Sequence, residues 1–444
     1  MIEKYYSGVI EQIYNRIGKE TRNIVMANYS NDFSIENLEV IRRYQSNEDN
    51  VFFAYSEFSY NTLVGAYEPF LDIICNMHRR FIGGSFDDFQ KECGVYYLHR
   101  QVLNSYYETG ECFREETVLL NEVAYEQRRM TMAIADMLKK LSEVKPLMIV
   151  INRFQMASKS SIETIKYLID NPCANIGIVL GVNAIDKGTD STVEVWDRIV
   201  ESLEDRSAIY YIGSAGPLKN NVKTTNDDEL YITMNFEQSI QEASNIMEFL
   251  DFEQARRGCR IIEHKLKFED AWIDEKSLRR FYMVYARTSV LLGEMSKAIE
   301  LTNEYKALIP ENDSEHYLSL YYFMKGTCYM YQGKLEKAGN SAKSAYDYAV
   351  LAEDDTLIFK AELLSVMIKM SGWYNIFFCV QDIPVSDEII EKLIKHGYRN
   401  HLAHIYIYAY DNSRDVVKQS FYDESLLKHF TKGLELAKEI GNEQ

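Results

Sequence analysis

The sequence predicts a three-layer α/β domain with a mostly parallel sheet, followed by an all-α solenoid of repeated helix pairs. In the first half of the chain, short apolar runs alternate with helix-like stretches, which is the pattern of a sheet built from βαβ units. Beyond a cluster of Gly, Pro, Asn and Asp at 213–229 the pattern is helical throughout and repeats. We therefore place the two domains at residues 1–230 and 231–444.

Five apolar runs of the first domain are typical of buried strands. Each run is short, rich in Val, Ile, Tyr or Phe, and bounded by polar turns, as are strands covered on both faces of a parallel sheet. Between them lie helix-like stretches, notably 114–144 and 160–171. The runs are RNIVMAN (22–28), NVFFAYSEF (50–58), KPLMIVIN (145–152), NIGIVLGVN (175–183) and SAIYYIG (207–213).

The helical region repeats at about 40 residues, a longer interval than the roughly 34 of a standard tetratricopeptide unit. In the segment 321–346, small residues fall where two helices would touch and a glycine falls at the turn. An unrelated helical bundle with chance spacing is the alternative. The residues concerned are Tyr322, Gly326, Tyr329, Gly333, Ala338, Ala342 and Ala345, and the aligned turns of successive units are Leu250, Gly293, Gly333, Gly372 and Asn412.

Composition excludes several classes of protein. The chain has 444 residues, 46% of them hydrophobic and 26% charged, which is ordinary for a globular protein. Its net charge of −18 argues against general affinity for nucleic acid or an anionic membrane. Seven scattered cysteines without C-x-x-C indicate neither a disulfide framework nor a zinc knuckle. Because no apolar run approaches a membrane span, we expect a cytoplasmic protein.

The first apolar run leads into a polar loop, ANYSNDFS, and then into a helix-like stretch. This is the layout of a phosphate-binding loop, in which glycines expose backbone N–H groups, a Lys contacts the terminal phosphates and a hydroxyl holds Mg²⁺. In that register Ala27 and Asp32 replace the glycines and Phe33 replaces the Lys. The groups that would still favour an anion are Asn28, Ser34 and the dipole of the following helix.

The third apolar run stands where a P-loop ATPase has its second diagnostic strand, which ends in acidic residues that order Mg²⁺. It resembles the pattern hhhhDDhQxxD of the STAND class of signalling ATPases, the AAA+-related group of maltose-regulator and LuxR-type activators. Asn152 and Arg153 replace the two acids, Gln155 matches, and Ser158 replaces the third acid. The family's Y-x-P-F helix start and sensor strand are similar to Tyr67, Pro69 and Phe70, and to the run that ends in Asn183.

The resemblance covers residues 8–213 and 238–444 through the order of their segments, and it implies a degenerate ATPase domain. Phe33 leaves no cation for the terminal phosphates, and Arg153 sets a positive charge where Mg²⁺ would bind. Intact Walker motifs, the lid, the winged-helix domain and the output domain of family members are missing. We therefore expect a pseudo-ATPase with no catalytic residue and no metal, for which ATP or ADP is the only cofactor considered.

The resemblance further implies a signalling or scaffold protein of transcriptional or second-messenger regulation. Its helical repeats would bind a protein or peptide, it would self-associate, and it would not bind nucleic acid directly. The alternative is an ATP/ADP-binding switch with weak or no hydrolysis, forming the sensory half of a larger regulator, since the last helix lacks the polar cap that closes a solenoid. Candidate peptide contacts are Tyr282, Tyr285, Tyr317, Tyr321 and Tyr322, although many aromatic residues of the repeats are expected to fill the core.

Other polar constellations are interpreted as structural. His401 and His404 lie one helical turn apart near His396, but no carboxylate follows at metal-ligand spacing, so we expect these histidines on a helix surface. The pairs Glu115–Glu116 and Asp87–Asp88 lie in polar stretches and are expected to be exposed.

Overall fold

The computed structural model contains two compact units, each described here by itself. The first consists of Met1–Val95, Val102–Cys112 and Ala124–Ala271, and the second of Tyr96–Gln101, Phe113–Val123 and Trp272–Gln444. The predicted domain boundary at residue 230 lies outside the described residues. The structure describes residues 2–29, 38–45, 50–59, 63–116, 118, 120–183, 209–211, 235–268, 273–312, 314–375, 387–406 and 424–440.

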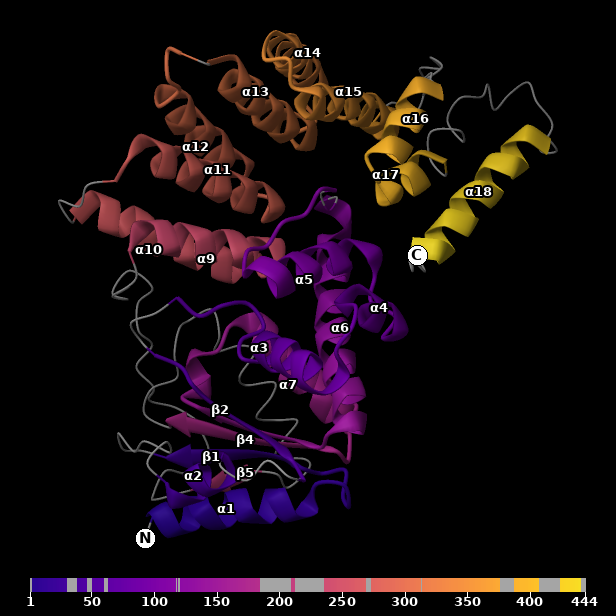
Figure 1. Cartoon of the computed structure of the whole chain (residues 1–444). Coiled ribbons are helices and arrows are strands. Elements are labelled where there is room, and N and C mark those ends of the chain that lie inside the picture. Colours follow the sequence, from indigo (N-terminus) through magenta and orange to yellow (C-terminus); the bar gives the residue numbers. More distant parts are fainter. Residues whose placement is uncertain are drawn as a thin grey trace. The chain divides into compact units, whose positions relative to one another are not determined.

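A five-stranded parallel sheet forms the centre of the first unit (Figure 1). Its strand order is β2-β3-β4-β1-β5, and each neighbouring pair is parallel. The five predicted strands are thus confirmed, because runs of Val, Ile and Phe without polar interruption are stable only where both faces of a strand are covered. The strands are β1 (Ile24–Tyr29), β2 (Phe52–Glu57), β3 (Leu147–Asn152), β4 (Ile176–Asn183) and β5 (Ile209–Tyr211).

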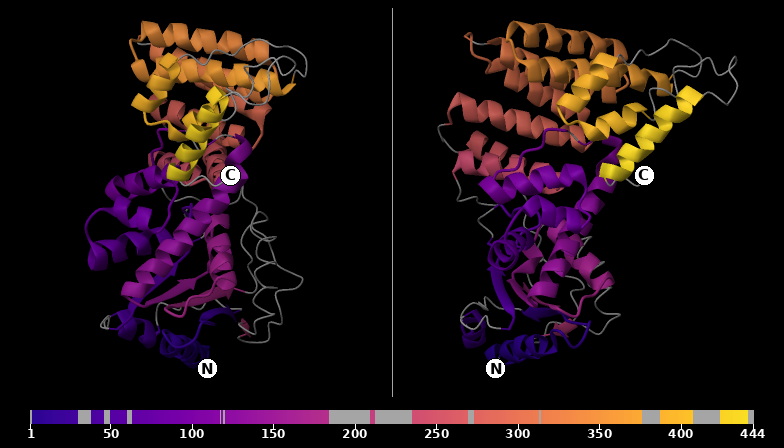
Figure 2. Two further views of the ribbon diagram at one scale, coloured as in Figure 1. Left: turned by 90° about the vertical axis from the view of Figure 1, so that its right-hand side faces the viewer. Right: turned by 45° about the vertical axis from the view of Figure 1, so that its right-hand side comes forward.

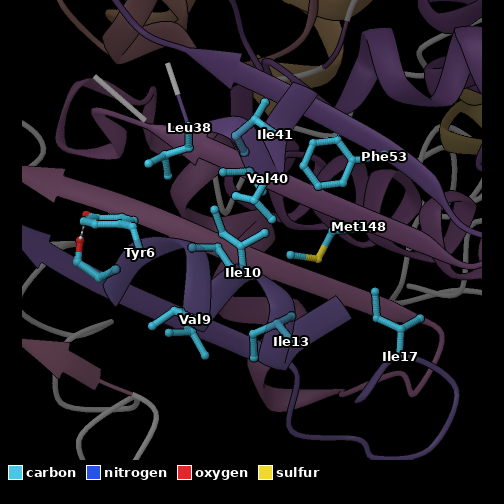
Figure 3. Close-up of a cluster of buried hydrophobic side chains, with 14 of the residues drawn as sticks. Tyr6, Val9, Ile10, Ile13, Ile17, Leu38, Val40, Ile41, Phe53 and Met148 are labelled. Atoms are coloured by element: carbon cyan, nitrogen blue, oxygen red, sulfur yellow. Dashed lines mark hydrogen bonds between the residues drawn. The ribbon is translucent and has the colours of Figure 1, made fainter. Parts of the chain in front are cut away.

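One face of the sheet is covered by α1 (Ile2–Arg16) and α2 (Glu39–Gln45). Tyr6, Ile10 and Ile13 of α1 pack with Phe53 and Met148 of the strands in one buried cluster (Figure 3). Helix and sheet approach closely at Gly177 of β4, where a Cβ atom would lie 2.8 Å from Cδ1 of Ile17. Because successive side chains of a strand point to opposite faces of the sheet, the strand residues outside this cluster face a second layer of helices.

Helices of the opposite layer include α3 (Phe70–Met77) and α7 (Lys159–Asp170), which lie over the other face of the sheet (Figure 1). The predicted helix at 160–171 is therefore confirmed. The helix expected over 114–144 begins only at Val123, because Glu116 turns its carboxylate to backbone N–H groups of a distant segment instead of entering a helix. The unit also contains η2 (His78–Ile82), α4 (Phe86–Glu92), α6 (Val123–Val144), η4 (Phe154–Met156), α9 (Phe236–Glu248) and α10 (Phe252–Phe268), and α5 (Tyr97–Thr109) and η3 (Leu120–Glu122) complete the order of elements up to α10.

Successive helices of the second unit pack side by side, as the orange helices of Figure 2 show. Gly293 and Gly333 adopt positive φ angles of 78° and 71° at the turns between paired helices, as predicted. Gly372 does not make the predicted turn, because it lies inside α15, which continues to Asn375. The turn before α15 contains Glu353 with φ 52°. Asn412 lies outside the described residues. The helices are α11 (Glu275–Leu291), α12 (Met295–Ala307), α13 (Ser314–Tyr331), α14 (Leu335–Leu351), α15 (Asp355–Asn375), α16 (Asp387–Lys395), α17 (Arg399–His404) and α18 (Glu424–Ile440).

The structure is thus a parallel α/β unit and a helical unit. Of the helices that the structure describes, none combines the length and the apolar character that a bilayer crossing needs.

Candidate functional site

The first candidate site lies at the carboxyl ends of the strands. The connections that follow β1 and β4 run toward opposite edges of the sheet. From β1 the chain runs to β2 at one edge, and from β4 it passes β1 to reach β5 at the other. Such a reversal of strand order is where open α/β sheets bind ligands. Ala27 is fully buried in β1, and its carbonyl oxygen accepts a hydrogen bond of 2.9 Å from the hydroxyl of Tyr6.

Only part of the predicted phosphate loop can be located. Asn28 lies in β1, paired in register with Val182 of β4, and nothing is described of its side chain. Asp32, Phe33 and Ser34 lie outside the described residues. The structure therefore places the strand that leads into the loop at the reversal of strand order.

The end of β3 carries the three other predicted positions. Asn152 is the last residue of the strand and is fully buried, and Gln155 is buried in η4. Arg153 between them adopts a left-handed backbone conformation with φ 54°, and its Nε lies 3.3 Å from Oε1 of Glu57 at the end of β2. A guanidinium with its own carboxylate partner thus stands directly after β3.

Ser158, in the place of the third family acid, has a structural role. It is the N-cap of α7, and its hydroxyl accepts a hydrogen bond from the backbone N–H of Ser161. An N-cap serine satisfies one of the free N–H groups of the first helical turn, so this position serves the helix.

The tyrosines predicted to contact a peptide divide into two groups. Tyr285 of α11 and Tyr321 of α13 are 3% and 2% exposed and belong to the helix packing, whereas Tyr282, Tyr317 and Tyr322 are half-buried. The rings of Tyr321 and Tyr322 meet edge to face, with their centroids 4.8 Å apart. The structure therefore brings Tyr321 and Tyr322 together, and it leaves Tyr282, Tyr317 and Tyr322 partly accessible.

Basic side chains lie against these tyrosine rings. The guanidinium carbon of Arg279 lies 5.0 Å from the ring centroid of Tyr317, and the ammonium nitrogens of Lys306 and Lys325 lie 5.2 and 5.1 Å from that of Tyr321. These are cation–π distances. The packing of α12 against α13 is thus rich in both tyrosine and positive charge.

A buried polar cluster in the second unit corrects the interpretation of the histidines. Nδ1 of His401 lies 2.6 Å from Oε1 of Glu116, and Nε2 of His404 lies 2.5 Å from Oε1 of Glu122. Asn400 joins the two pairs, since its backbone N–H donates to Glu116 and its side-chain amide donates to Glu122. Glu116 and Asn400 are fully buried, and His401 is 3% exposed.

This cluster, which we call the Glu–His clasp, connects the segment 113–123 to α17. His401 is neither on a surface nor without a carboxylate, and Glu116 is not exposed, so both predictions were wrong. Burial works to raise the pKa of Glu122, but the hydrogen bond and the charge of His404 outweigh it, and the pKa of Glu122 is lowered. A partial signal was present in the sequence, namely three glutamates close to apolar residues in a short segment.

An acidic cavity of about 230 Å³ lies in the first unit. Burial, with the neighbouring Glu68, raises the pKa of Glu242 to about 7, and the hydroxyl of Tyr106 donates a 3.0 Å hydrogen bond to Asp72. A wider groove of about 470 Å³ between α6 and α7 mixes Arg128 and Lys166 with carboxylates. The acidic cavity, and not the wider groove, is lined by Leu63, Gly65, Ala66, Glu68, Leu71, Asp72, Tyr106, Glu242, Asn245 and Phe249.

Comparisons with known proteins add no relative. No protein-family model matches the chain, and no curated protein matches it. Among the residues with a described position there is no group of three or more His, Cys, Asp or Glu side chains that could hold a metal ion. A function for this chain has to be argued from its own residues.

Proposed function

We propose that the chain is a non-catalytic signalling or scaffold protein, in which a pseudo-ATPase unit accompanies helix pairs that bind a protein or peptide. The observation that carries the proposal is the end of β3, where Asn152 and Arg153 stand in place of Mg²⁺-ordering acids and Arg153 is paired with Glu57. Hydrolysis of a nucleoside triphosphate depends on Mg²⁺ held by such acids. An arginine at this place works against the metal.

The size of this effect follows from Coulomb's law. Two unit charges about 4 Å apart repel by about 4 kcal/mol at an effective dielectric constant of about 20, and Mg²⁺ carries twice the charge. The side chain of Arg153 is 33% exposed, so solvent screening reduces the repulsion, and Glu57 offsets part of it. Neither effect turns the arginine into a metal ligand.

An assay of Mg²⁺-dependent phosphate release from ATP tests the absence of catalysis. The whole chain and the variant Ser34→Ala are compared with a protein-free blank. We expect no Mg²⁺-dependent release above the blank for either protein. Release that requires Mg²⁺ and disappears in Ser34→Ala contradicts the proposal, because it shows that the loop hydroxyl still serves the chemistry.

Partner binding is supported by the half-buried rings of Tyr317 and Tyr322 on α13, since aromatic side chains dominate the energetics of protein interfaces. A peptide library offered to the whole chain tests it, with Tyr317→Ala as the variant and Tyr346→Ala as the matched control. Tyr346 lies on α14 and is 37% exposed. We expect retained peptides to bind Tyr317→Ala more weakly and Tyr346→Ala unchanged. Equal binding to both variants contradicts this role.

A second candidate function is an ATP/ADP-binding switch without hydrolysis. The reversal of strand order at β1 favours it, because the loop after β1 then begins where open α/β sheets bind ligands. A thermal-shift titration with millimolar ATP and ADP tests it. A rise in Tm that Ser34→Ala removes supports the switch, and an unchanged Tm contradicts it.

A further inference from the structure

Two lysine side chains converge on one tyrosine ring where α12 packs against α13. The ammonium nitrogens of Lys306 and Lys325 lie 5.2 and 5.1 Å from the ring centroid of Tyr321. Lys325 also donates a 2.8 Å hydrogen bond to the Tyr321 hydroxyl, which donates in turn to Asn303 at 3.4 Å. Both charges are therefore at most about 10 Å apart, one Debye length at ordinary ionic strength, and act on a ligand together.

Neither of these ammonium groups has a carboxylate partner among the residues that the structure describes. Within the described ranges no carboxylate forms an ion pair with Lys306 or Lys325, whereas Lys392 on α16 pairs with Glu362 at 2.7 Å. Partial burial works to lower the pKa of Lys325, but the hydrogen bond with Tyr321 outweighs it and raises the pKa. Two lysine ammonium groups thus lie against one ring in a chain whose net charge is −18.

The aromatic surroundings fix these charges in place and offer contact area. Tyr321 itself is only 2% exposed, so it positions the two lysines and does not reach a ligand. Tyr317, one helical turn earlier, is half-buried and lies against Arg279. The hydroxyl of Tyr305 on α12 is buried and, within the part of the chain described, has no hydrogen-bond partner. Of these three rings, only that of Tyr317 is exposed enough to contact a ligand.

From this geometry we infer that the surface formed by Lys306, Lys325 and Tyr317, in which the buried Tyr321 positions the two lysines, binds an acidic, extended segment of a partner protein. We call it the lysine–tyrosine surface. The inference rests on the proposed function, because it names the chemistry of the partner that the helix pairs bind.

The chemistry of this surface selects such a segment. Ammonium groups form charge-assisted hydrogen bonds with carboxylates, which are stronger than neutral ones. Side chains two residues apart in an extended chain point the same way and lie about 7 Å apart, so alternate acidic residues reach both lysines at once. The half-buried ring of Tyr317 covers the aliphatic parts of such side chains.

Fluorescence anisotropy with three labelled peptides tests the inference on the whole chain. The peptides have equal length and the same apolar residues, and they carry Glu, Ser or Lys at alternate positions. We expect the Glu peptide to bind about tenfold or more tightly than the Ser peptide, and to weaken as NaCl is added. The double variant Lys306→Gln/Lys325→Gln should lose this advantage, whereas Lys343→Gln, an exposed lysine of α14, should keep it.

Three results would contradict the inference, and they differ in what they imply for the proposed function. If the Glu and Ser peptides bind equally, or if the double variant keeps the preference, the inference is wrong while peptide binding itself, and the proposed function, stand. If no peptide binds, both fail. If inorganic phosphate displaces the Glu peptide at equal concentration, the surface is a general anion site and the inference also fails. The charge reversal Lys306→Glu/Lys325→Glu gives an independent check, since it should favour the Lys peptide.

Discussion

Replacing Glu116 by Gln is expected to weaken the Glu–His clasp by about 3 kcal/mol, through the buried donors that the carboxylate now satisfies. The carboxylate accepts hydrogen bonds from the backbone N–H groups of Asn400 and His401, and its Oε1 faces Nδ1 of His401 at 2.6 Å. Gln keeps the volume, but its amide NH₂ replaces one acceptor opposite these donors and the charge is lost. Leaving a buried donor unsatisfied costs about 1–3 kcal/mol, and a loss at the upper end of this range is expected because several donors share one carboxylate.

Hydrogen exchange of the α17 amides measures this effect locally, which matters in a chain of two units that need not unfold together. A loss of about 3 kcal/mol corresponds to roughly a hundredfold faster exchange of amides protected by the clasp. Glu115→Gln is the matched control, because Glu115 is the preceding residue and its side chain is exposed. If Glu116→Gln speeds exchange no more than Glu115→Gln, the buried carboxylate contributes nothing and the reasoning is refuted.

Four further predictions concern titration, packing and helix propensity. The folded pKa of Glu122 is lowered from 4.5, so its ionised form stabilises the fold above pH 4.5 and this stabilisation is lost as the pH falls. The helical unit should therefore unfold at lower urea concentration in acid, and Glu122→Gln should show a smaller change with pH. Glu242 has the opposite sign: its pKa is raised from 4.5 to about 7, so the Tm of the α/β unit should fall as pH rises across this interval, and Glu242→Gln should flatten the fall. Gly177→Ala should lower the free energy of unfolding by about 1–3 kcal/mol, because the new Cβ meets Ile17 at 2.8 Å. Gly8→Ala, on helix α1 with no atom within 4 Å, should instead stabilise by up to about 1 kcal/mol in the same denaturation experiment.

The strands could be predicted because their signal is local. All six residues of β3 are buried, so the sequence at 147–152 has no polar residue before the last position. Strand order is not local, since it depends on where each crossover returns to the sheet. The left-handed backbone conformation of Arg153 could not be predicted either, because this conformation is indicated by glycine or asparagine and neither occupies the position.

In the helical unit, too, local features could be predicted from the sequence and contacts between distant residues could not. Gly293 and Gly333 indicate turns because their positive φ angles favour glycine. Gly372 misled the prediction, since a glycine inside a helix costs only about 1 kcal/mol and long packed helices such as α15 tolerate it. The Glu–His clasp could not be predicted, because Glu116 and His401 are separated by 285 positions and no local pattern links them.

The same separation has a consequence for the synthesis of the chain. Glu116 leaves the ribosome 285 residues before the imidazole that faces it, which at about 5–20 residues per second is a delay on the order of tens of seconds. Throughout that interval the segment 113–123 lacks its native neighbours from α17, and it acquires them only after Arg399–His404 has been synthesised. A truncated product that ends before α17 therefore leaves the carboxylates of Glu116 and Glu122 without the hydrogen bonds that Asn400, His401 and His404 make to them in the fold.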